Sequence, residues 1–410
     1  MDNIVYFHGA KVSLAPFFVI FYAWEQRKLD ELVKFYSGLT YKPEDVTENG
    51  TLVLRSSNVK NSEIVLTDNV YVDESVVNSD NVKKDDIIVV VRNGSKALIG
   101  KHAKIRHSMP NTVIGAFMTG LRSDSPDFIN ALLSTEMFDK EIKMNMGATI
   151  NQITGYMFAN MEFMTPSFQE RQAVGSFFSR LDDLITLHQR KCETLQKLKK
   201  SMLQKMFPKN GSCFPEIRFA GFTDAWELRK LGEIADIVGG GTPSTSNPDY
   251  WDGDIDWYAP AEISEQIFIN SSSRKITKSG FENSSAKMLP VGTVLFTSRA
   301  GIGKTAILCK EGCTNQGFQS IVPHENELDS YFIFSRTEEL KRYGETKGAG
   351  STFVEVSGKQ MTNMTLMMPT SFEEQRQIGA YFRTLDHLIT LHQRKPFQHI
   401  MEVINIAKRY

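Results

Sequence analysis

Residues 168–191 read FQERQAVGSFFSRLDDLITLHQRK, and residues 372–395 read FEEQRQIGAYFRTLDHLITLHQRK. The two stretches are identical at 14 of 24 positions and stand 204 residues apart. A second repeated pair lies upstream, at residues 23–40 and 225–242, where nine of 18 positions match. Between these segments the similarity fades. A period near 200 residues is too long for a solenoid repeat, so the sequence indicates a tandem duplication in which the connecting segments stayed alike and the domains diverged.

The repeated segments 168–191 and 372–395 are predicted to form long amphipathic helices. Serine precedes glutamate by three residues in each (Ser167-x-x-Glu170 and Ser371-x-x-Glu374), which is the capping-box pattern of a helix start. The first helix is expected to reach about Phe207, a length of about 55 Å at 1.5 Å per residue. Apolar steps of three and four residues predict a coiled-coil-like seam. The predicted seam residues are Val174, Phe177, Leu181, Leu184, Leu195, Leu198, Met202, Ile378, Tyr381, Leu385 and Leu388.

Two polar residues interrupt this seam in each copy. They are His188 and Lys191 in the first copy, and His392 and Lys395 in the second. We interpret them as a break that sets the register of the helix pair, and a metal-binding or catalytic histidine is the alternative.

The composition is that of a globular chain with more than one domain. Its 410 residues exceed what one hydrophobic core usually serves, and 41% of them are apolar. The net charge of −1 excludes a uniformly basic nucleic-acid coat but allows a local basic patch. Four cysteines favour a reducing compartment over a disulfide framework. The apolar run from Val12 to Trp24 is too short to span a bilayer and lacks the marks of a signal peptide, so a cytoplasmic protein is expected.

The diverged segments are predicted to be mixed α/β domains. Short apolar runs and helical stretches alternate there with glycine-containing turns. Strands are expected at 51–54, 87–91, 294–296 and 305–308, and helices at 127–137 and 330–342. The predicted fold class is therefore α+β, with two mixed α/β domains in tandem separated by long spacer helices.

Three short motifs resemble chemical sites without completing them. Gly303-Lys304-Thr305 ends like a phosphate-binding loop, but Ser298 replaces the first glycine and strands flank the turn. Asn247-Pro-Asp-Tyr250 resembles the base-flipping loop of amino-methyltransferases, yet a proline and the methyl-donor motif are missing. Cys309 and Cys313 have no further ligands for a zinc site. The sequence therefore predicts no catalytic residues, no metal site and no cofactor in this chain.

Basic and amide side chains gather at the predicted strand ends and loops. Arg, Asn and Gln are the residues that make bidentate contacts with base edges, whereas Lys mostly meets phosphate. The candidate DNA-contacting residues are Arg55, Ser57, Asn58, Lys60, Arg92, Asn93, Lys101, Lys104 and Arg106 in the first domain, and Arg274, Lys275, Lys278, Arg299, Lys304, Asn315, Gln316 and Gln319 in the second.

The chain resembles the specificity subunits of type I restriction–modification systems. The resemblance rests on AWELRKLGEIADIVGGGTPSTSNPDYWDGDIDWYAPAEI (225–263), VGTVLFTSRAGIGKTAIL (291–308) and TNQGFQSI (314–321). It also rests on MMPTSFEEQRQIGAYFRTLDHLITLHQRK (367–395) and KLKKSMLQKMFP (197–208), so it covers about residues 23 to 395.

This resemblance implies a non-catalytic, bacterial, double-stranded-DNA-binding subunit. Each diverged domain would be a target-recognition domain that reads one half of a bipartite site, and the two spacer helices would pack antiparallel. Two modification subunits would dock on this frame, bind S-adenosylmethionine and methylate adenine, and restriction subunits would complete the complex. The expected divisions are a lead-in at 1–22, recognition domains at 23–166 and 225–369, spacer helices at 167–208 and 370–410, and a linker at 209–224.

Two segments depart from the family pattern. Residues 1–22 do not resemble the internal lead-in at 215–224. After Lys395 the second copy reads PFQHIMEVINIAKRY, beginning with a proline that disfavours a helix interior. We therefore expect a kinked or separate helix at about 397–408 that covers the distal seam of the first spacer helix imperfectly.

Two alternatives of other classes stay open. A duplicated coiled-coil protein could bridge two protein partners without binding DNA. A stand-alone DNA methyltransferase is the other, and the missing methyl-donor motif argues against it.

Overall fold

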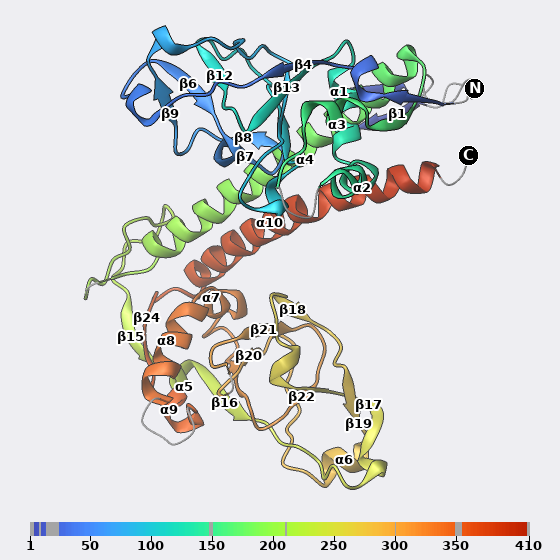
Figure 1. The fold of residues 1–410 in the computed structure, drawn as a ribbon. Coiled ribbons are helices and arrows are strands. Elements are labelled where there is room, and N and C mark those ends of the chain that lie inside the picture. Colours follow the sequence, from blue (N-terminus) through green and yellow to red (C-terminus); the bar gives the residue numbers. More distant parts are fainter. Residues whose placement is uncertain are drawn as a thin grey trace. The chain divides into compact units, whose positions relative to one another are not determined.

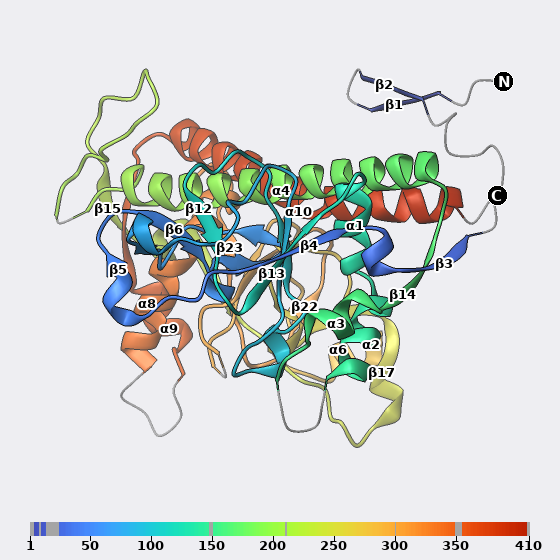
Figure 2. The ribbon, with the colours of Figure 1, turned by 45° about the horizontal axis from the view of Figure 1, so that its top comes forward.

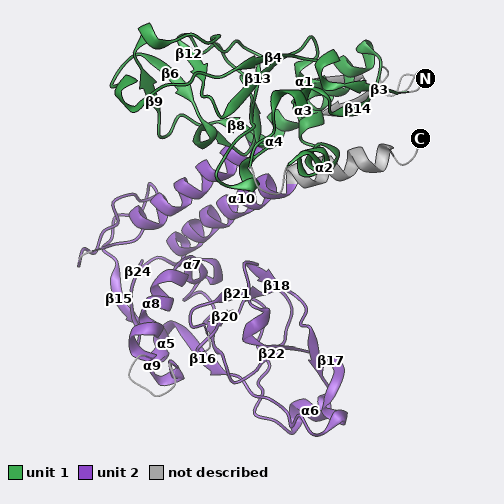
Figure 3. Ribbon diagram, in the orientation of Figure 1, with its two compact units in different colours: residues 1–186 green, residues 187–410 purple. Residues whose placement is uncertain are grey.

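A computed structural model divides the chain into two compact units, residues 1–186 and 187–410 (Figure 3). Each unit contains one α/β domain, and the long helix α4 (Phe168–Lys205) belongs to the first unit up to residue 186 and to the second from 187. The structure describes residues 24–146, 151–209, 211–299, 301–348 and 355–394, together with the backbone alone of 4–7, 10–13 and 395–407. Of the expected lead-in 1–22, it therefore describes only the backbone of the β1–β2 hairpin (Ile4–Phe7 and Ala10–Ser13).

Two four-stranded sheets form the domain of unit 1 (Figure 1). The first has the order β11-β10-β13-β4 and is antiparallel, and the second has the order β12-β6-β9-β5 with β12 and β6 parallel. The bounds are β4 (Lys34–Ser37), β5 (Val46–Thr47), β6 (Thr51–Leu54), β9 (Val70–Val72), β10 (Ile87–Val90), β11 (His102–Lys104), β12 (Thr112–Ile114) and β13 (Met118–Arg122). A separate hairpin pairs β7 (Val59–Lys60) with β8 (Glu63–Ile64).

Three helices and a returning strand close this domain. The helices are α1 (Pro126–Leu133), α2 (Glu136–Asn145) and α3 (Gly155–Ala159). Strand β14 (Glu162–Thr165) then pairs antiparallel with β3 (Glu25–Lys28), and α4 follows. The two repeated sequence segments of the first copy thus meet at one edge of the domain.

The domain of unit 2 repeats this plan. Its first sheet has the order β16-β23-β20-β21-β18, and its second has the order β19-β17-β22 with β17 and β22 parallel. The strand bounds are β16 (Ala235–Gly239), β17 (Trp251–Tyr258), β18 (Phe268–Ile269), β19 (Arg274–Ile276), β20 (Val294–Phe296), β21 (Thr305–Leu308), β22 (Cys313–Thr314) and β23 (Gln319–Pro323). The later elements are α7 (Ser330–Ser335), α8 (Thr337–Gly348), α9 (Gly358–Thr362) and β24 (Thr365–Met368), which pairs with β15 (Glu227–Lys230) before α10 (Phe372–Ala407). Short helices α5 (Leu231–Ile234) and α6 (Lys278–Glu282) complete it.

The predicted α+β class with two tandem domains is confirmed, and so are the four predicted strands. Each predicted helical stretch contains a break that the sequence reading missed. The stretch 127–137 breaks at Ser134–Thr135, because the Thr135 hydroxyl accepts the Phe138 N–H at 3.3 Å and starts a new helix. The stretch 330–342 breaks at Arg336, between α7 and α8.

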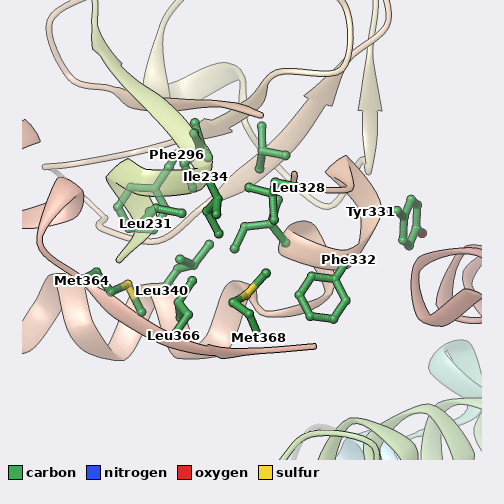
Figure 4. Close-up of a cluster of buried hydrophobic side chains, with 14 of the residues drawn as sticks. Leu231, Ile234, Phe296, Leu328, Tyr331, Phe332, Leu340, Met364, Leu366 and Met368 are labelled. Atoms are coloured by element: carbon green, nitrogen blue, oxygen red, sulfur yellow. The ribbon is translucent and has the colours of Figure 1, made fainter. Parts of the chain in front are cut away.

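The largest apolar core lies in unit 2 (Figure 4). Leu231, Phe296 and Leu340 from the domain meet Leu366 of β24 there. Buried side chains of α10, among them Phe382, belong to the same cluster, and the distal part of α4 packs against it. The end of α4 and the start of α10 are therefore anchored on the second domain.

Within unit 2, residues 187–205 of α4 lie antiparallel beside α10 (Figure 2). His188 Nδ1 lies 2.8 Å from His392 Nδ1, and the Lys199 ammonium donates to Asp386 at 2.6 Å. Residue numbers rise along α4 from His188 to Lys199, while those of their partners on α10 fall from His392 to Asp386. The two helices are therefore antiparallel here. His188 and His392 are repeat equivalents, 204 residues apart in the sequence.

This packing corrects part of the predicted seam. His188, Cys192 and Leu195 of α4 face inward in steps of four and three residues, whereas Leu198 is 37% exposed and Lys191 is exposed. The predicted seam through Leu198 and the observed seam through Cys192 and Lys199 both fit the spacing of apolar residues. The observed seam is favoured because the Lys199 ammonium reaches Asp386. Leu184 is also exposed, while Val174 packs on the domain core of unit 1. Phe177 meets Phe178, and Leu181, Tyr381 and Leu388 are half-buried, with Ile378 and Leu385 buried.

For the C-terminal tail, the expectations of a separate helix and of a tail that covers the distal seam of the first spacer helix were wrong. Helix α10 continues through Pro396 to Ala407 as one element. A proline removes only one backbone donor, and a helix that its other hydrogen bonds support can tolerate that loss. In addition, the antiparallel direction places the distal part of α4 against the first half of α10, so the tail is not the segment that covers it. The side chains of residues 395–410 lie outside the described part.

Candidate nucleic-acid interface

In unit 1, three loops of the domain meet at one end of its sheets. They follow β6 and β10, and the third is the turn between β12 and β13. The Asn93 amide donates to the Ser56 hydroxyl at 3.0 Å, and the Val91 N–H donates to the Phe117 carbonyl at 3.0 Å. We call residues 55–58, 91–95, 115–117 and 152 loop site 1.

The matching loops of unit 2 meet in the same way. They follow β17 and β20, and the third is the turn between β22 and β23. The Ser298 N–H donates to the Gly317 carbonyl at 2.8 Å, and the Asn315 N–H donates to the carbonyl of Tyr258, the last residue of β17, at 3.0 Å. We call residues 259–262, 298–299, 301–303, 315–317 and 355 loop site 2.

One backbone hydrogen bond is common to both sites. The Ile153 N–H donates to the Val91 carbonyl at 2.9 Å, and the Val356 N–H donates to the Ser298 carbonyl at 3.0 Å. The segment before α3 or α9 thereby completes each site. Strand order, loop order and this bond together make the two loop sites structural equivalents.

Several predicted DNA-contacting residues are engaged in holding the protein together. Asn58 of loop site 1 is fully buried, and its amide bonds to backbone groups of its own loop region. Arg55 donates to the Asp68 carboxylate at 2.8 Å. Lys104 pairs with Asp127 and is 11% exposed. Buried, fully bonded groups are poorly placed to meet a base, so we assign Asn58 and Lys104 structural roles.

The remaining candidates of the first domain are more accessible. Arg92, Lys60 and Lys101 are exposed, whereas Ser57 and Asn93 are half-buried. Arg106 pairs with Asp183 of α4 and so joins the domain to its helix. Loop site 1 thus contains Arg55, Ser57, Asn58, Arg92 and Asn93 of the predicted residues, and Lys60, Lys101, Lys104 and Arg106 lie outside it.

In the second domain, loop site 2 contains Arg299, Asn315 and Gln316. The Asn315 side-chain oxygen accepts the Gly317 N–H at 2.8 Å, which shapes the turn. Outside the site, the Arg274 guanidinium stacks 3.7 Å from the Trp251 ring centroid. The other predicted residues outside it are Lys275, Lys278, Lys304 and Gln319, of which Lys278 and Lys304 are exposed.

A buried carboxylate organises the basic residues near β17. Asp256 accepts hydrogen bonds from Lys310 at 2.8 Å and from the Ser272 hydroxyl at 3.1 Å, and Lys275 lies 3.6 Å away. Burial acts to raise the pKa of the Asp256 carboxyl, but the bonds from Lys310 and Ser272 outweigh it and hold the pKa below its usual value. Lys275 therefore neutralises a protein carboxylate, a partner that sequence spacing did not reveal.

The glycine turn at 301–303 is a hairpin connection, not a phosphate cradle. The Gly303 N–H donates to the Thr297 carbonyl at 3.0 Å, and the Lys304 N–H donates to the Thr297 hydroxyl at 3.0 Å. A phosphate loop needs such N–H groups free and a helix behind them. Here β21 follows the turn, and Gly303, at φ 93°, packs against Lys341 of α8.

Sequence reasoning missed Phe117 in loop site 1. This side chain is 50% exposed and stands under the Arg92 guanidinium, 5.1 Å from ring centroid to Cζ. It lies in a turn between two strands, where periodicity carries no signal. The one clue in the sequence is an aromatic residue two positions after Gly115.

Within the described residues, no three His, Cys, Asp or Glu side chains gather as metal ligands. The same part of the chain contains no helix both long and apolar enough to cross a membrane.

Comparison with known proteins decides the family. The family described as "Type I restriction modification DNA specificity domain" matches residues 23–197 and 223–398. The chain belongs to this family. It carries two tandem copies of the DNA specificity domain, and together they cover most of its length.

Curated relatives are named as specificity subunits of type I restriction enzymes. The chain is 34% identical to the MjaIX specificity subunit of Methanocaldococcus jannaschii over 47% of its own length and 44% of that protein, so it spans less than half of that relative. It is 23% identical to the putative MjaX specificity subunit of the same organism over 92% of this chain and 89% of the relative. The S subunit of a type I system from M. genitalium shares the fold, with a TM-score of 0.60 and 15% identity over 94% of each chain.

Proposed function

We propose that this chain is the non-catalytic DNA-specificity subunit of a type I restriction–modification complex. In this proposal, the domain at 23–166 reads one half of a bipartite site and the domain at 225–369 reads the other. The observation that carries the proposal is the pair of equivalent loop sites on duplicated domains of a DNA-specificity family. Loops that differ in sequence on a common frame are suited to reading different half-sites.

The spacer helices would hold the two domains and receive the modification subunits. We assign the spacers to 167–208 and 370–410, the linker to 209–224 and the lead-in to 1–22. Leu184, Leu187 and Leu198 of α4 are 41%, 47% and 37% exposed and recur at helical spacing. Exposed apolar residues on one helix face favour a protein partner, and we propose a modification subunit as that partner.

Chemistry would then belong to the partners. Two modification subunits would bind S-adenosylmethionine and methylate adenine, restriction subunits would join the full complex, and the assembly would work in the cytoplasm. Lys101 and Lys304 flank the equivalent β10–β11 and β20–β21 hairpins as exposed cations and would meet phosphates.

Co-expression with a modification subunit tests this proposal. Mapping of methylated adenines across the host genome should show one bipartite motif that depends on this chain. The purified chain alone should transfer no methyl group but should shift a DNA duplex in a salt-dependent manner. Methyl transfer by the chain alone would contradict the proposal, and so would the absence of any motif from an assembled complex.

A further inference from the structure

Arg92 and Arg299 occupy the same place in the two loop sites. Arg92 forms an isolated antiparallel bridge with Gln152, and Arg299 forms one with Glu355. Each arginine directly follows the residue whose carbonyl accepts the hydrogen bond from the segment before α3 or α9. The two arginines stand 207 residues apart, not the 204 of the helices, so alignment at a fixed spacing does not pair them.

Both guanidinium groups are available to a ligand. In the part of the chain that the structure describes, neither side chain makes a hydrogen bond or an ion pair within the protein. Arg55, in contrast, is paired with Asp68, and Arg218 is paired with Glu374. Arg92 is exposed and Arg299 is half-buried. An arginine without a protein partner, held at the end of a strand, can approach the floor of a DNA groove.

The two arginines also differ in their aromatic neighbours. Arg92 stacks over the half-exposed ring of Phe117, whereas the equivalent position in loop site 2 is Gly317. A side chain cannot be accommodated at 317 without movement, because a Cβ there would lie 2.7 Å from Pro260 Cγ. Stacking limits the directions in which the Arg92 guanidinium can point, while no aromatic ring among the described residues stacks on Arg299.

We propose that Arg92 and Arg299 are the equivalent base-contacting arginines of the two domains, and that Phe117 orients Arg92. The proposal rests on the proposed DNA-specificity function and adds the residues that determine one position in each half-site. Arginine presents two parallel donors that match the O6 and N7 acceptors of guanine in the major groove. Each domain would therefore require a guanine at one position. A rigidly held arginine discriminates more sharply, since less freedom is lost on binding.

The test maps the methylated motif in cells that contain the complete complex with variant specificity subunits. Arg92→Ala should reduce discrimination at one position of one half-site on the order of 10- to 100-fold, and Arg299→Ala should do the same only in the other half. Phe117→Ala should weaken the same position as Arg92→Ala by a smaller factor. Arg92→Lys and Arg299→Lys keep the charge but lose the fork, so the same positions should relax.

Arg27→Ala and Arg229→Ala are the matched controls. These repeat-equivalent arginines lie on β3 and β15 in surface ion pairs and should leave the motif unchanged. An unchanged motif in the assembled Arg92 or Arg299 variants would overturn the inference, as would full discrimination in the lysine variants, which indicates a phosphate contact. If the alanine variants fail to assemble, the lysine variants decide. A wild-type complex without any motif would instead contradict the proposed function itself.

Discussion

The two domains use the same repeated residues to hold their helices, but in different surroundings. The Trp24 indole donates to Glu170 at 3.2 Å, and its repeat equivalent Trp226 donates to Glu374 at 3.2 Å. Trp24 is 42% exposed, whereas Trp226 is 2% exposed. The duplicated contact therefore lies at the surface in the first copy and inside the core in the second.

In the second domain, Phe207 and Phe332 pack against Trp226, and a residue of the lead-in segment joins the contact. Arg218, from the lead-in of the second domain, donates to both carboxylate oxygens of Glu374 at 2.7 and 2.8 Å. Residues 1–22 have a different sequence and place Pro16 at the corresponding position, 202 residues earlier. In the second domain the tryptophan–glutamate pair thus has a third, charged member. Repeated residues therefore predicted a repeated contact but not its burial.

The largest expected effect comes from breaking the buried contact. Glu374→Ala leaves the Arg218 charge and the Trp226 N–H without their acceptor, and we expect a loss of about 3 kcal/mol in the free energy of unfolding. Glu170→Ala, its exposed equivalent, should cost at most about 1 kcal/mol. Denaturant unfolding of both variants measures the difference. Equal losses would mean that the lead-in contributes nothing to the contact.

Two repeat-equivalent glycines test how each helix packs on its domain. A Cβ at Gly175 of α4 would lie 2.4 Å from the backbone nitrogen of Phe128 in α1. A Cβ at Gly379 of α10 would lie 2.4 Å from the Asp329 carboxylate, which caps α7 by accepting the Phe332 N–H at 2.7 Å. Gly→Ala should therefore cost about 1–3 kcal/mol at either site. Gly175→Ala should be the more harmful, because backbone cannot rotate away as a carboxylate can. Thermal unfolding that ranks them in the reverse order would contradict this packing account.

The histidine pair of unit 2 should show strong coupling. His188→Leu or His392→Leu alone removes one of the two imidazoles that meet in this contact, at a cost of about 1–3 kcal/mol. The double variant restores an apolar contact between α4 and α10 and should recover most of that loss. A double-mutant cycle by denaturant unfolding measures the interaction. Simply additive losses would show that the two imidazoles do not stabilise the helix pair together.

Mild acid should affect the first domain more than the second. The buried His102 imidazole bonds to Ser134 at 3.1 Å, and the equivalent contact of the second domain joins Thr305 and Thr337 at 2.8 Å. Burial lowers the pKa of His102 below its ordinary value, partly opposed by a hydrogen bond to the Gly100 carbonyl. The unfolded chain therefore binds the proton more readily, and stability falls as pH drops below the unfolded pKa near 6.5.

This loss can reach about 1.4 kcal/mol for each pH unit below that value. His102→Gln removes the titrating group and should shrink the stability difference between pH 7.5 and pH 5.5. Thermal unfolding at the two pH values measures it, with Thr305→Ser as the control in the second domain. An unchanged pH difference in the glutamine variant would assign the acid sensitivity to other groups.

Much of the fold could be predicted because the identical residues of the repeat are concentrated in the segments that connect the domains. The helices α4 and α10 and the strands β6, β10, β20 and β21 follow from apolar spacing alone. Alignment of the two halves at one fixed spacing did not reveal the similarity of the domains. Ile87 of β10 corresponds to Val294, 207 residues later, whereas Leu121 of β13 corresponds to Ile321, 200 residues later. Insertions and deletions in the loops therefore conceal a conserved strand order.

The site was harder to predict because residue type does not reveal a partner. Asn58 and Lys104 have the chemistry of DNA contacts, but a buried loop and an aspartate respectively engage them. A phenylalanine side chain cannot form hydrogen bonds with a base edge, and the proposed role of Phe117 follows only from its position beneath Arg92. The antiparallel direction of the helix pair was hard to predict for a similar reason. The spacing of apolar residues along one helix does not show which half of the other helix it contacts.

The exchange of one recognition domain tests the central claim most directly. Residues 40–165 are replaced by the corresponding segment of another specificity subunit, the complex is assembled with modification subunits, and methylated adenines are mapped. The account predicts a motif in which one half-site changes while the other half-site stays as in the wild type. A motif altered in both halves would contradict independent reading by two equivalent domains.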